Sequence, residues 1–186
     1  MKPPLTDEDY IEAAERLGCD VAAIKAVSQV ESGPYGAFLA SDEPVILFER
    51  HIFHRLTDGK YDNHPDISNK ESGGYGPAAI QHARLQIAAE LDRDAALQSA
   101  SWGKFQILGK NWESLKYASL QEFINAMYRS EKDQLDSFVR FVEVNGLAKY
   151  LKAKQWSKFA RGYNGEAFHR NSYDSKMALA YKKWAI

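Results

Sequence analysis

Helical periodicity dominates this chain of 186 residues, and one short run breaks the pattern. Apolar side chains recur three and four residues apart, most clearly over residues 120–127 and 135–144, as in helices that pack on a core. Residues 44–50 are the strongest β-like run, because four consecutive apolar residues follow a proline there. The pattern predicts a single mainly α (α+β) domain over residues 1–186, helical with one small β element.

The first thirty residues predict two consecutive helices. Thr6 precedes three acidic residues and is a typical N-cap, and Gly18 ends the apolar spacing that follows it. Asp20 is expected to cap a second helix, which runs to Glu31 and stops before Gly33 and the proline after it. The second predicted helix therefore ends on a carboxylate.

The rest of the chain predicts a long loop followed by more helices. Residues 57–78 are rich in Gly, Asp, Asn, Ser and Pro, and long loops in compact domains are usually functional. Helices are expected over 78–91, 94–100, 111–117, 119–129, 131–145, 147–152, 154–161 and 175–184.

Composition narrows the possible chemistry. The chain is 45% hydrophobic and 26% charged, has no apolar run of about 20 residues, and begins with a polar, acidic segment that is no secretory signal. A single cysteine, Cys19, excludes an internal disulfide and a cysteine-based zinc site, and its position between two helices makes it a poor nucleophile candidate. His51 and His54 are three residues apart but lack an evident third ligand, so we expect neither metal nor cofactor.

Charge is unevenly distributed although the formal net charge is only −1. Residues 1–100 hold 9 Lys/Arg against 17 Asp/Glu, whereas residues 147–186 hold 9 against 2. The basic end could meet an anionic partner, or both ends could fold together and neutralise each other. The near-zero total and the lack of a basic helix-turn-helix signature argue against nucleic acid.

Three short motifs carry the functional signal. They are Glu31-Ser32 at a helix end, Ser101-x-Gly103-x-x-Gln106, and Tyr163-Asn164-Gly165. In this order they resemble the lysozyme-like superfamily, which includes goose-type lysozymes and soluble lytic transglycosylases. The chain as a whole resembles phage-type N-acetylmuramidases, the single-domain endolysins. The resemblance implies a lysozyme-like fold, with the small β element after the helix of the catalytic glutamate, and peptidoglycan as the substrate.

Glycoside hydrolysis needs a proton donor, and in many enzymes a second carboxylate. By resemblance Glu31 is the catalytic acid, and its apolar neighbours in sequence should raise its pKa. Glu49 is the best candidate for the base, since it lies in the β-like run, where we expect it to share a face with Val45 and Leu47. A structural ion pair between Glu49 and an arginine is the alternative. A catalytic Glu49 predicts an inverting hydrolase.

The resemblance also supplies candidate substrate-binding residues, namely Ser32, Ser101, Gln106, Tyr163 and Asn164. We add two aromatic residues, Trp102 within the second motif and Tyr75 in the Gly-rich loop. We expect the Tyr163 hydroxyl to orient Glu31, and Asn164 to serve the substrate or the loop. Trp102 could offer a sugar platform or simply pack, and Tyr75 could stack on a sugar or anchor its loop.

The resulting prediction is a monomeric muramidase that cleaves the β-1,4 bond between N-acetylmuramic acid and N-acetylglucosamine during phage lysis. We expect it to stay in the host cytoplasm until a holin releases it, and then to act on the wall from the periplasm. The basic C-terminal segment could contact outer-membrane lipid. A lytic transglycosylase and a non-catalytic peptidoglycan-binding protein remain the alternatives.

Overall fold

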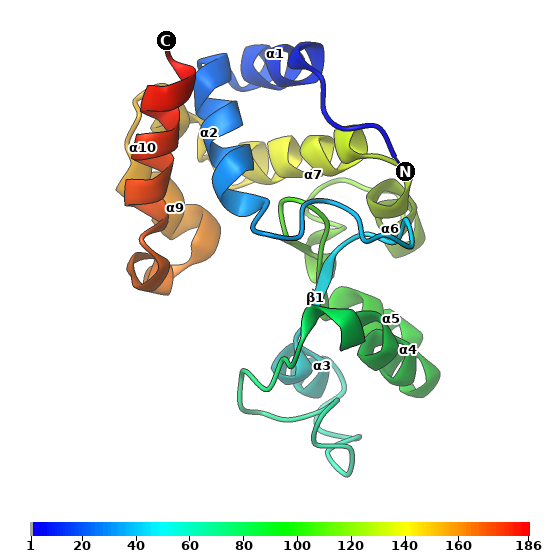
Figure 1. The fold of residues 1–186 in the computed structure, drawn as a ribbon. Helices are drawn as coiled ribbons and strands as arrows, with labels where there is room; N and C mark the ends of the chain where they lie inside the picture. Colours follow the sequence, from blue (N-terminus) through cyan, green and yellow to red (C-terminus); the bar gives the residue numbers. More distant parts are fainter. Residues whose placement is uncertain (1) are drawn as a thin grey trace.

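The computed structural model describes residues 2–186, which form two lobes on either side of a wide opening (Figure 1). The helical lobe contains α1 (Asp7–Leu17), α2 (Val21–Glu31), α6 (Leu120–Arg129), α7 (Glu131–Val144), α8 (Ala148–Lys152), α9 (Trp156–Asn164) and α10 (Tyr173–Trp184). The small lobe contains α3 (Arg50–Leu56), the loop over residues 57–77, η1 (Ala78–Ile80), α4 (Gln81–Leu91) and α5 (Arg93–Gln98).

A three-stranded antiparallel sheet, ordered β1-β2-β3, lies between the lobes. Its strands are β1 (Ile46–Phe48), β2 (Ala100–Trp102) and β3 (Ile107–Leu108). In the register Ile46 pairs with Trp102, and Ser101 pairs with both Leu47 and Leu108. The predicted β element is therefore present but shorter than residues 44–50, and its two partner strands come from a hairpin that the sequence did not reveal.

The first two helices begin and end where predicted, with one change at Asp20. The Thr6 side chain accepts from the Asp9 amide in a capping box, and Gly18 ends α1 in the left-handed conformation. Asp20 occupies the N-cap of α2, but its side chain makes no capping hydrogen bond. Its carboxylate instead pairs with Lys154 at 2.8 Å and accepts from the Tyr181 hydroxyl at 2.8 Å. Asp20 thus ties α2 to the C-terminal segment.

Most later helices also follow the prediction, and three segments differ. Residues 111–117 form the end of η2 (Gly109–Asn111) and a series of turns, because so short a window of helical spacing cannot offset helix nucleation. Residue Ala100, expected to end a helix, begins β2 instead. The predicted helix over 154–161 begins at Trp156 and continues to Asn164, after which η3 (Glu166–Asn171) follows.

Large buried aromatic side chains fill the core, and α2 lies within it. The fully buried set includes Phe48, Phe53, Trp102, Phe105, Phe123, Phe138 and Phe159. Residues Ile24 and Val27 of α2 have no exposed surface, and α2 packs against both α1 and α10. Burial of both side chains fixes the last turn of α2, and therefore the position of Glu31, relative to the sheet.

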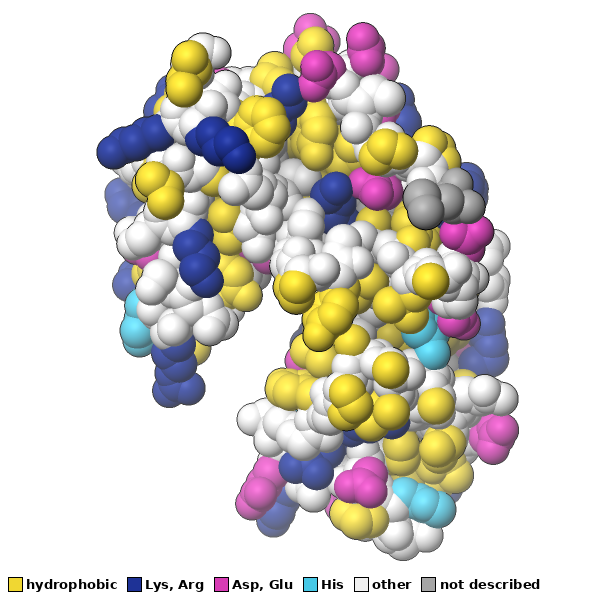
Figure 2. Space-filling model, viewed as in Figure 1, with side chains coloured by type: hydrophobic (Ala, Val, Ile, Leu, Met, Phe, Trp, Pro, Cys, Tyr) yellow, Lys and Arg dark blue, Asp and Glu magenta, His cyan; other side chains and the backbone are white. Residues whose placement is uncertain are grey.

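The acidic and basic ends of the chain meet only in part. Lys154 pairs with Asp20, and Trp184 donates to the Gln29 side chain at 2.9 Å. Other basic side chains remain around the outer edge of α9 and α10, on the left of Figure 2. Within residues 2–186 the helices all fall short of the length and apolar content that crossing a membrane would require.

Candidate active site

Glu31 is the last residue of α2, and it faces the opening between the lobes. Burial of its carboxyl group raises its pKa to about 7, and a hydrogen bond donated by Asn164 Nδ2 to Glu31 Oε1 at 3.2 Å lowers it by a smaller amount. A carboxyl group with this pKa is about half protonated at neutral pH. Glu31 can therefore donate a proton under conditions in which ordinary carboxyl groups are ionised.

Tyr163 and Asn164 lie at the end of α9, and their roles are the reverse of those predicted. Asn164 contacts Glu31 directly, whereas the Tyr163 hydroxyl donates to the carbonyl of Phe105 at 2.6 Å. Burial raises the pKa of Tyr163, and the nearby charge of Glu31 raises it further, so the phenol stays protonated. Tyr163 thus ties α9 to the β2–β3 turn and leaves Asn164 beside the acid.

A cleft of about 290 Å³ begins at Glu31 and continues toward the small lobe. Figure 2 shows the molecule deeply hollowed between the two lobes. The cleft is lined by Glu31, Ser32, Gly33, Tyr35, Gly36, Val45, Ile46, Leu47, Gly76, Pro77, Ala78, Gln81, Gly103 and Gln106. Its walls therefore combine apolar surface with a few polar groups, as expected of a ligand site.

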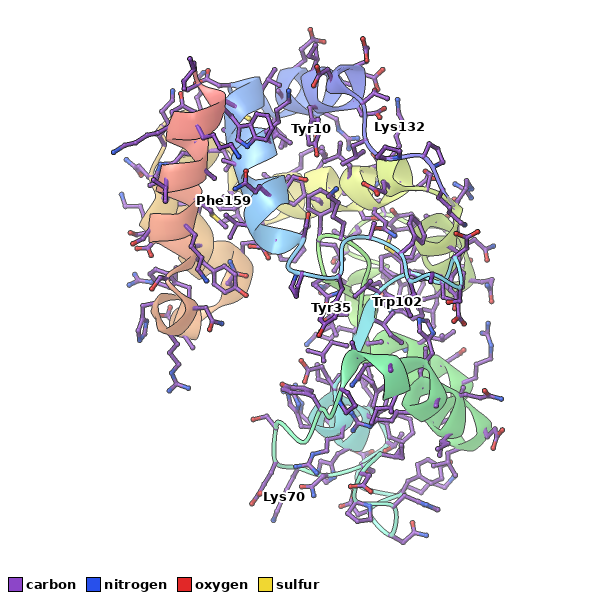
Figure 3. All side chains as sticks on the ribbon, in the orientation of Figure 1. Tyr10, Tyr35, Lys70, Trp102, Lys132 and Phe159 are labelled. Carbon is purple, nitrogen blue, oxygen red and sulfur yellow. The ribbon has the colours of Figure 1, made fainter. Side chains whose placement is uncertain are left out.

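The segment after α2 forms one wall of the cleft. The Ser32 hydroxyl donates to the Ser28 carbonyl, so this predicted substrate-binding residue uses its hydroxyl to end the helix. Tyr35 lies between two glycines of positive φ, Gly33 and Gly36, and is 59% exposed. Figure 3 shows Tyr35 at the inner wall of the opening. Nothing in the sequence distinguished Tyr35 from an ordinary loop aromatic.

The Ser-x-Gly-x-x-Gln motif is the β2–β3 hairpin. Gly103 and Gln106 line the cleft, and the Gln106 side chain donates to the Gly103 carbonyl at 2.9 Å. Gly103 has a φ of +70°, and a Cβ there would lie 2.4 Å from Gln134 Cδ, so only glycine fits without displacing the buried Gln134. Ser101 lies opposite Leu47, on the half-exposed face of the sheet that Leu47 presents to the cleft.

Trp102 is a core residue, so of its two predicted roles packing is confirmed and a sugar platform is wrong. The side chain is 1% exposed, and its indole N–H donates to the Leu97 carbonyl at 3.1 Å. Trp102 alternates with Ser101 along β2 and points to the opposite face, toward α6. Figure 3 places it inside the molecule at the junction of the lobes.

Glu49 follows directly after β1 and is the N-cap of α3. Because β1 ends at Phe48, strand alternation does not place Glu49 on the face of Val45 and Leu47 as predicted. Val45 and Leu47 line the cleft, and Glu49 is not among its lining residues. The Glu49 side chain is 15% exposed and lies 3.3 Å from the imidazole of His51, measured between Glu49 Oε2 and His51 Nδ1. Within the described chain no arginine lies within 4.0 Å of the Glu49 carboxylate, so the predicted alternative, an ion pair with arginine, is wrong.

Tyr75 joins the Gly-rich loop to Glu49. Burial raises the pKa of the Tyr75 phenol, and the neighbouring Glu49 carboxylate raises it further. The Tyr75 carbonyl accepts from Gln81 Nε2 at 2.6 Å and from Arg84 Nη1 at 3.0 Å. The predicted alternative of a loop anchor is therefore confirmed for its backbone, while its side chain lies beside the second candidate carboxylate.

Gln81 is a structural centre of the small lobe that the sequence did not indicate. Its side chain is 1% exposed, accepts from the Phe48 amide at 3.0 Å, and donates to the carbonyls of Tyr75 and Pro77. One buried amide thus fixes the end of β1, and with it Glu49, relative to the Gly-rich loop. Glutamine on a predicted helix carries no signal of such a role.

Other reactive side chains have local explanations. Burial raises the pKa of the Cys19 thiol to about 11, so the thiolate is scarce at neutral pH. His54 contacts Asp62 at 2.8 Å, whereas His51 contacts Glu49. The two histidines of α3 therefore serve different carboxylates and do not share a site.

A partly protonated glutamate at a helix end, a small sheet and a cleft between two lobes define the lysozyme-like class of glycoside hydrolases. The chain belongs to the N-acetylmuramidase family, which it matches over residues 20–185. Members of this family act on peptidoglycan.

The chain is similar to a solved structure described as a Burkholderia AP3 phage endolysin. The two are 42% identical in sequence with a TM-score of 0.90, and the match covers 97% of this chain and 70% of that chain. A search of the curated proteins gives no match. The predicted mainly α, lysozyme-like fold and the resemblance to phage-type muramidases are thereby confirmed.

Proposed function

We propose that this protein is a lysozyme-type muramidase that hydrolyses the β-1,4 bond between N-acetylmuramic acid and N-acetylglucosamine. The observation that carries the proposal is Glu31, whose pKa of about 7 leaves it about half protonated at neutral pH at the edge of the cleft. The N-acetylmuramidase family supplies the substrate class. The similarity to a phage endolysin supports a role in host lysis.

In the proposed reaction Glu31 is the general acid and Glu49 the general base. Glu31 gives its proton to the glycosidic oxygen as the bond from that oxygen to the sugar C1 breaks. Glu49 takes a proton from a water whose oxygen forms the new bond to C1 from the opposite face. The product then has inverted configuration, and this two-carboxylate chemistry requires neither metal nor cofactor.

The glycan strand is proposed to lie along the cleft, in contact with both lobes. Gln106 and the neighbouring backbone groups offer hydrogen bonds to an N-acetyl group, with Ser101 on the adjoining sheet face. The exposed ring of Tyr35 offers an apolar face to a sugar ring. Tyr35 thus takes the stacking role that Trp102 cannot fill.

Digestion of purified peptidoglycan, followed by mass spectrometry with and without borohydride reduction, tests this proposal. Wild type should release reducible muramic acid ends, and Glu31→Gln should release almost none. Anhydro ends, lighter by one water, would instead identify a lytic transglycosylase, which needs no base such as Glu49. Binding without cleavage by both proteins would identify a peptidoglycan-binding module.

The cellular setting is a separate part of the proposal. We propose that the enzyme is a monomer, remains in the host cytoplasm until a holin opens the inner membrane, and then cleaves the wall from the periplasm. Lysines that lack a carboxylate within 4.0 Å in the described part of the chain, among them Lys176, Lys182 and Lys183, surround exposed Leu179 on α10. This basic, partly apolar surface could contact anionic outer-membrane lipid.

A further inference from the structure

Glu49 and His51 are linked in a way that the proposed hydrolysis does not by itself require. Glu49 Oε2 and His51 Nδ1 are both buried atoms that make no hydrogen bond with good geometry in the described chain. They lie 3.3 Å apart, and the Tyr75 phenol also adjoins the Glu49 carboxylate. Buried polar atoms are seldom left unpaired, so an unpaired one calls for an explanation, and a catalytic role is one such explanation.

The local backbone explains why these two side chains meet. Glu49 is the N-cap of α3 in an extended conformation, and His51 is the second residue of that helix. An N-cap side chain usually accepts from a backbone amide of the first turn, but Glu49 makes no such bond. Its carboxylate lies instead beside the imidazole of His51, which is in the first turn of the same helix.

The pair follows β1, whose residues Ile46 and Leu47 line the cleft, although neither Glu49 nor His51 is itself among the lining residues. The phenol of Tyr75 adjoins the Glu49 carboxylate, and Gln81 fixes the strand end just before it. Arg50, between the two residues in sequence, donates to the Pro65 carbonyl at 3.2 Å and packs on Gly74. Arg50 Nη1 is thus engaged with the loop, while Arg50 Nε is a third buried atom without a hydrogen bond in the described chain. The imidazole of His51 and the phenol of Tyr75 are the polar side chains beside the Glu49 carboxylate.

We propose that His51 is a positioning residue for Glu49, an inference that rests on the assignment of Glu49 as the base. An Nδ1–H that donates to Oε2 would fix the orientation of the carboxylate and leave Oε1 to accept the proton of the attacking water. His51 touches neither sugar nor water in this arrangement. It acts only through the geometry of the base, where a displacement of about 1 Å can cost on the order of 100-fold in rate.

Steady-state kinetics on soluble peptidoglycan fragments tests this assignment. His51→Leu should lower kcat by roughly 10- to 100-fold and change KM by less than about twofold. His51→Asn should restore most of the activity, because the asparagine amide can donate from nearly the same place as Nδ1. His54→Leu is the matched control on the same helix, and it should leave kcat near the wild-type value.

A double variant separates positioning from general damage. In a Glu49→Gln background, adding His51→Leu should reduce kcat by less than about twofold, because the base is already absent. A full additional loss would overturn the inference. If His51→Leu kept the wild-type kcat while Glu49→Gln was inactive, the role of His51 would be overturned. The assignment of Glu49 as the base would then still stand. Full activity of Glu49→Gln would show that Glu49 is not the base.

The ¹⁵N NMR signals of the His51 imidazole give a readout that does not depend on catalysis. Protonated Nδ1 should appear in wild type, and its shift should change in Glu49→Gln while the His54 signals stay in place. Signals of His51 that are identical in both proteins would contradict the proposed hydrogen bond, even if His51→Leu failed to fold.

Discussion

The surroundings of Glu31 in the helical lobe differ from those of Glu49 in the small lobe. The helical lobe holds Glu31 at the end of an apolar helix, where burial raises its pKa and one amide, from Asn164, contacts it. The small lobe holds Glu49 at the start of a helix among an imidazole, a phenol and nearby arginines. Burial thus keeps the Glu31 carboxyl group partly protonated at neutral pH, whereas Glu49 lies among polar side chains.

The two environments also differ in how they are built. Glu31 depends on helix packing between α2, α9 and α10, which join residues far apart in sequence. Glu49 depends on side-chain bonds within a loop-rich lobe, chiefly those of Gln81 and Arg84 to the Tyr75 carbonyl. The position of Glu31 therefore depends on apolar packing, and that of Glu49 on a network of hydrogen bonds around it.

The largest expected effect is at the acid itself. Glu31→Gln should lower kcat by at least about 1,000-fold, because the leaving oxygen loses its proton donor. Reducing-end release from peptidoglycan measures this.

The same substitution should stabilise the protein above pH 7. Since the folded-state pKa of about 7 exceeds the ordinary 4.5, wild type loses stability as pH rises between these values.

This stability difference can be checked by thermal unfolding at several pH values. The gain of Glu31→Gln over wild type should be on the order of 3 kcal/mol larger at pH 8 than at pH 4. A difference that does not depend on pH would show that Glu31 is not buried as an acid.

The next effect tests the other lobe. Glu49→Gln should lower kcat by roughly 100- to 1,000-fold with little change in fold. Added azide, a nucleophile that needs no base, should restore turnover in Glu49→Ala and yield a glycosyl azide of inverted configuration. ¹H NMR of the product that wild type first releases decides the stereochemistry: inversion gives the α anomer, and a β anomer would mean retention and would break the proposed division between acid and base.

Variants of Gly103 test the packing of the β2–β3 turn, which lies between the two lobes. Gly103→Ala should lower the free energy of unfolding by roughly 2–4 kcal/mol, through a positive φ and a clash with Gln134. Gly146→Ala is the matched control, because Gly146 has a φ of +65° but open space around it. Chemical denaturation should show a smaller loss of about 1 kcal/mol for that variant. Equal losses would mean that the Gln134 contact is unimportant.

Variants of Asn164 and Tyr163, at the end of α9, distinguish an effect on the pKa of Glu31 from an effect on stability. Asn164→Leu removes the bond that lowers the pKa of Glu31, so the alkaline limb of the pH–activity profile should move to higher pH. Tyr163→Phe removes only the bond to the Phe105 carbonyl, and should cost about 1 kcal/mol of stability with the limb unchanged. A limb that moves in Tyr163→Phe instead would restore the role predicted from sequence.

The smallest expected effect concerns substrate contact. Tyr35→Ala should raise KM by roughly three- to tenfold at nearly constant kcat, since an aromatic contact contributes about 0.5–1.5 kcal/mol. Tyr35→Phe keeps the ring and should behave as wild type in the same assay. An unchanged KM in Tyr35→Ala would mean that the glycan passes the exposed ring without stacking on it.

Local signals in the sequence located the helices and the acid. The N-cap at Thr6, the stop at Gly18 and the spacing into Glu31 are all short-range features, and each appears as predicted. Residues 111–117 show the limit of such signals, because a short apolar spacing suits a buried turn as well as a helix.

The contacts that form the site could not be predicted from the spacing of residues in the sequence. Trp102 is core because β2 pairs on both sides, and Tyr35 is exposed because the loop after α2 turns toward the cleft. Gln81 and His51 acquire their roles only when the small lobe folds around Glu49. Tyr163 and Asn164 were found as a pair, but the rotation of α9 decides which of them faces Glu31.

The pKa of Glu31 tests the central claim most directly. The protein would be labelled with ¹³C at glutamate carboxyl groups, and the Glu31 resonance, assigned by its loss in Glu31→Gln, would be followed from pH 3 to pH 9. The burial of Glu31 in the helical lobe predicts a midpoint near 7. A midpoint near the ordinary value of 4.5 would contradict the account, because Glu31 would then be ionised when it must donate a proton.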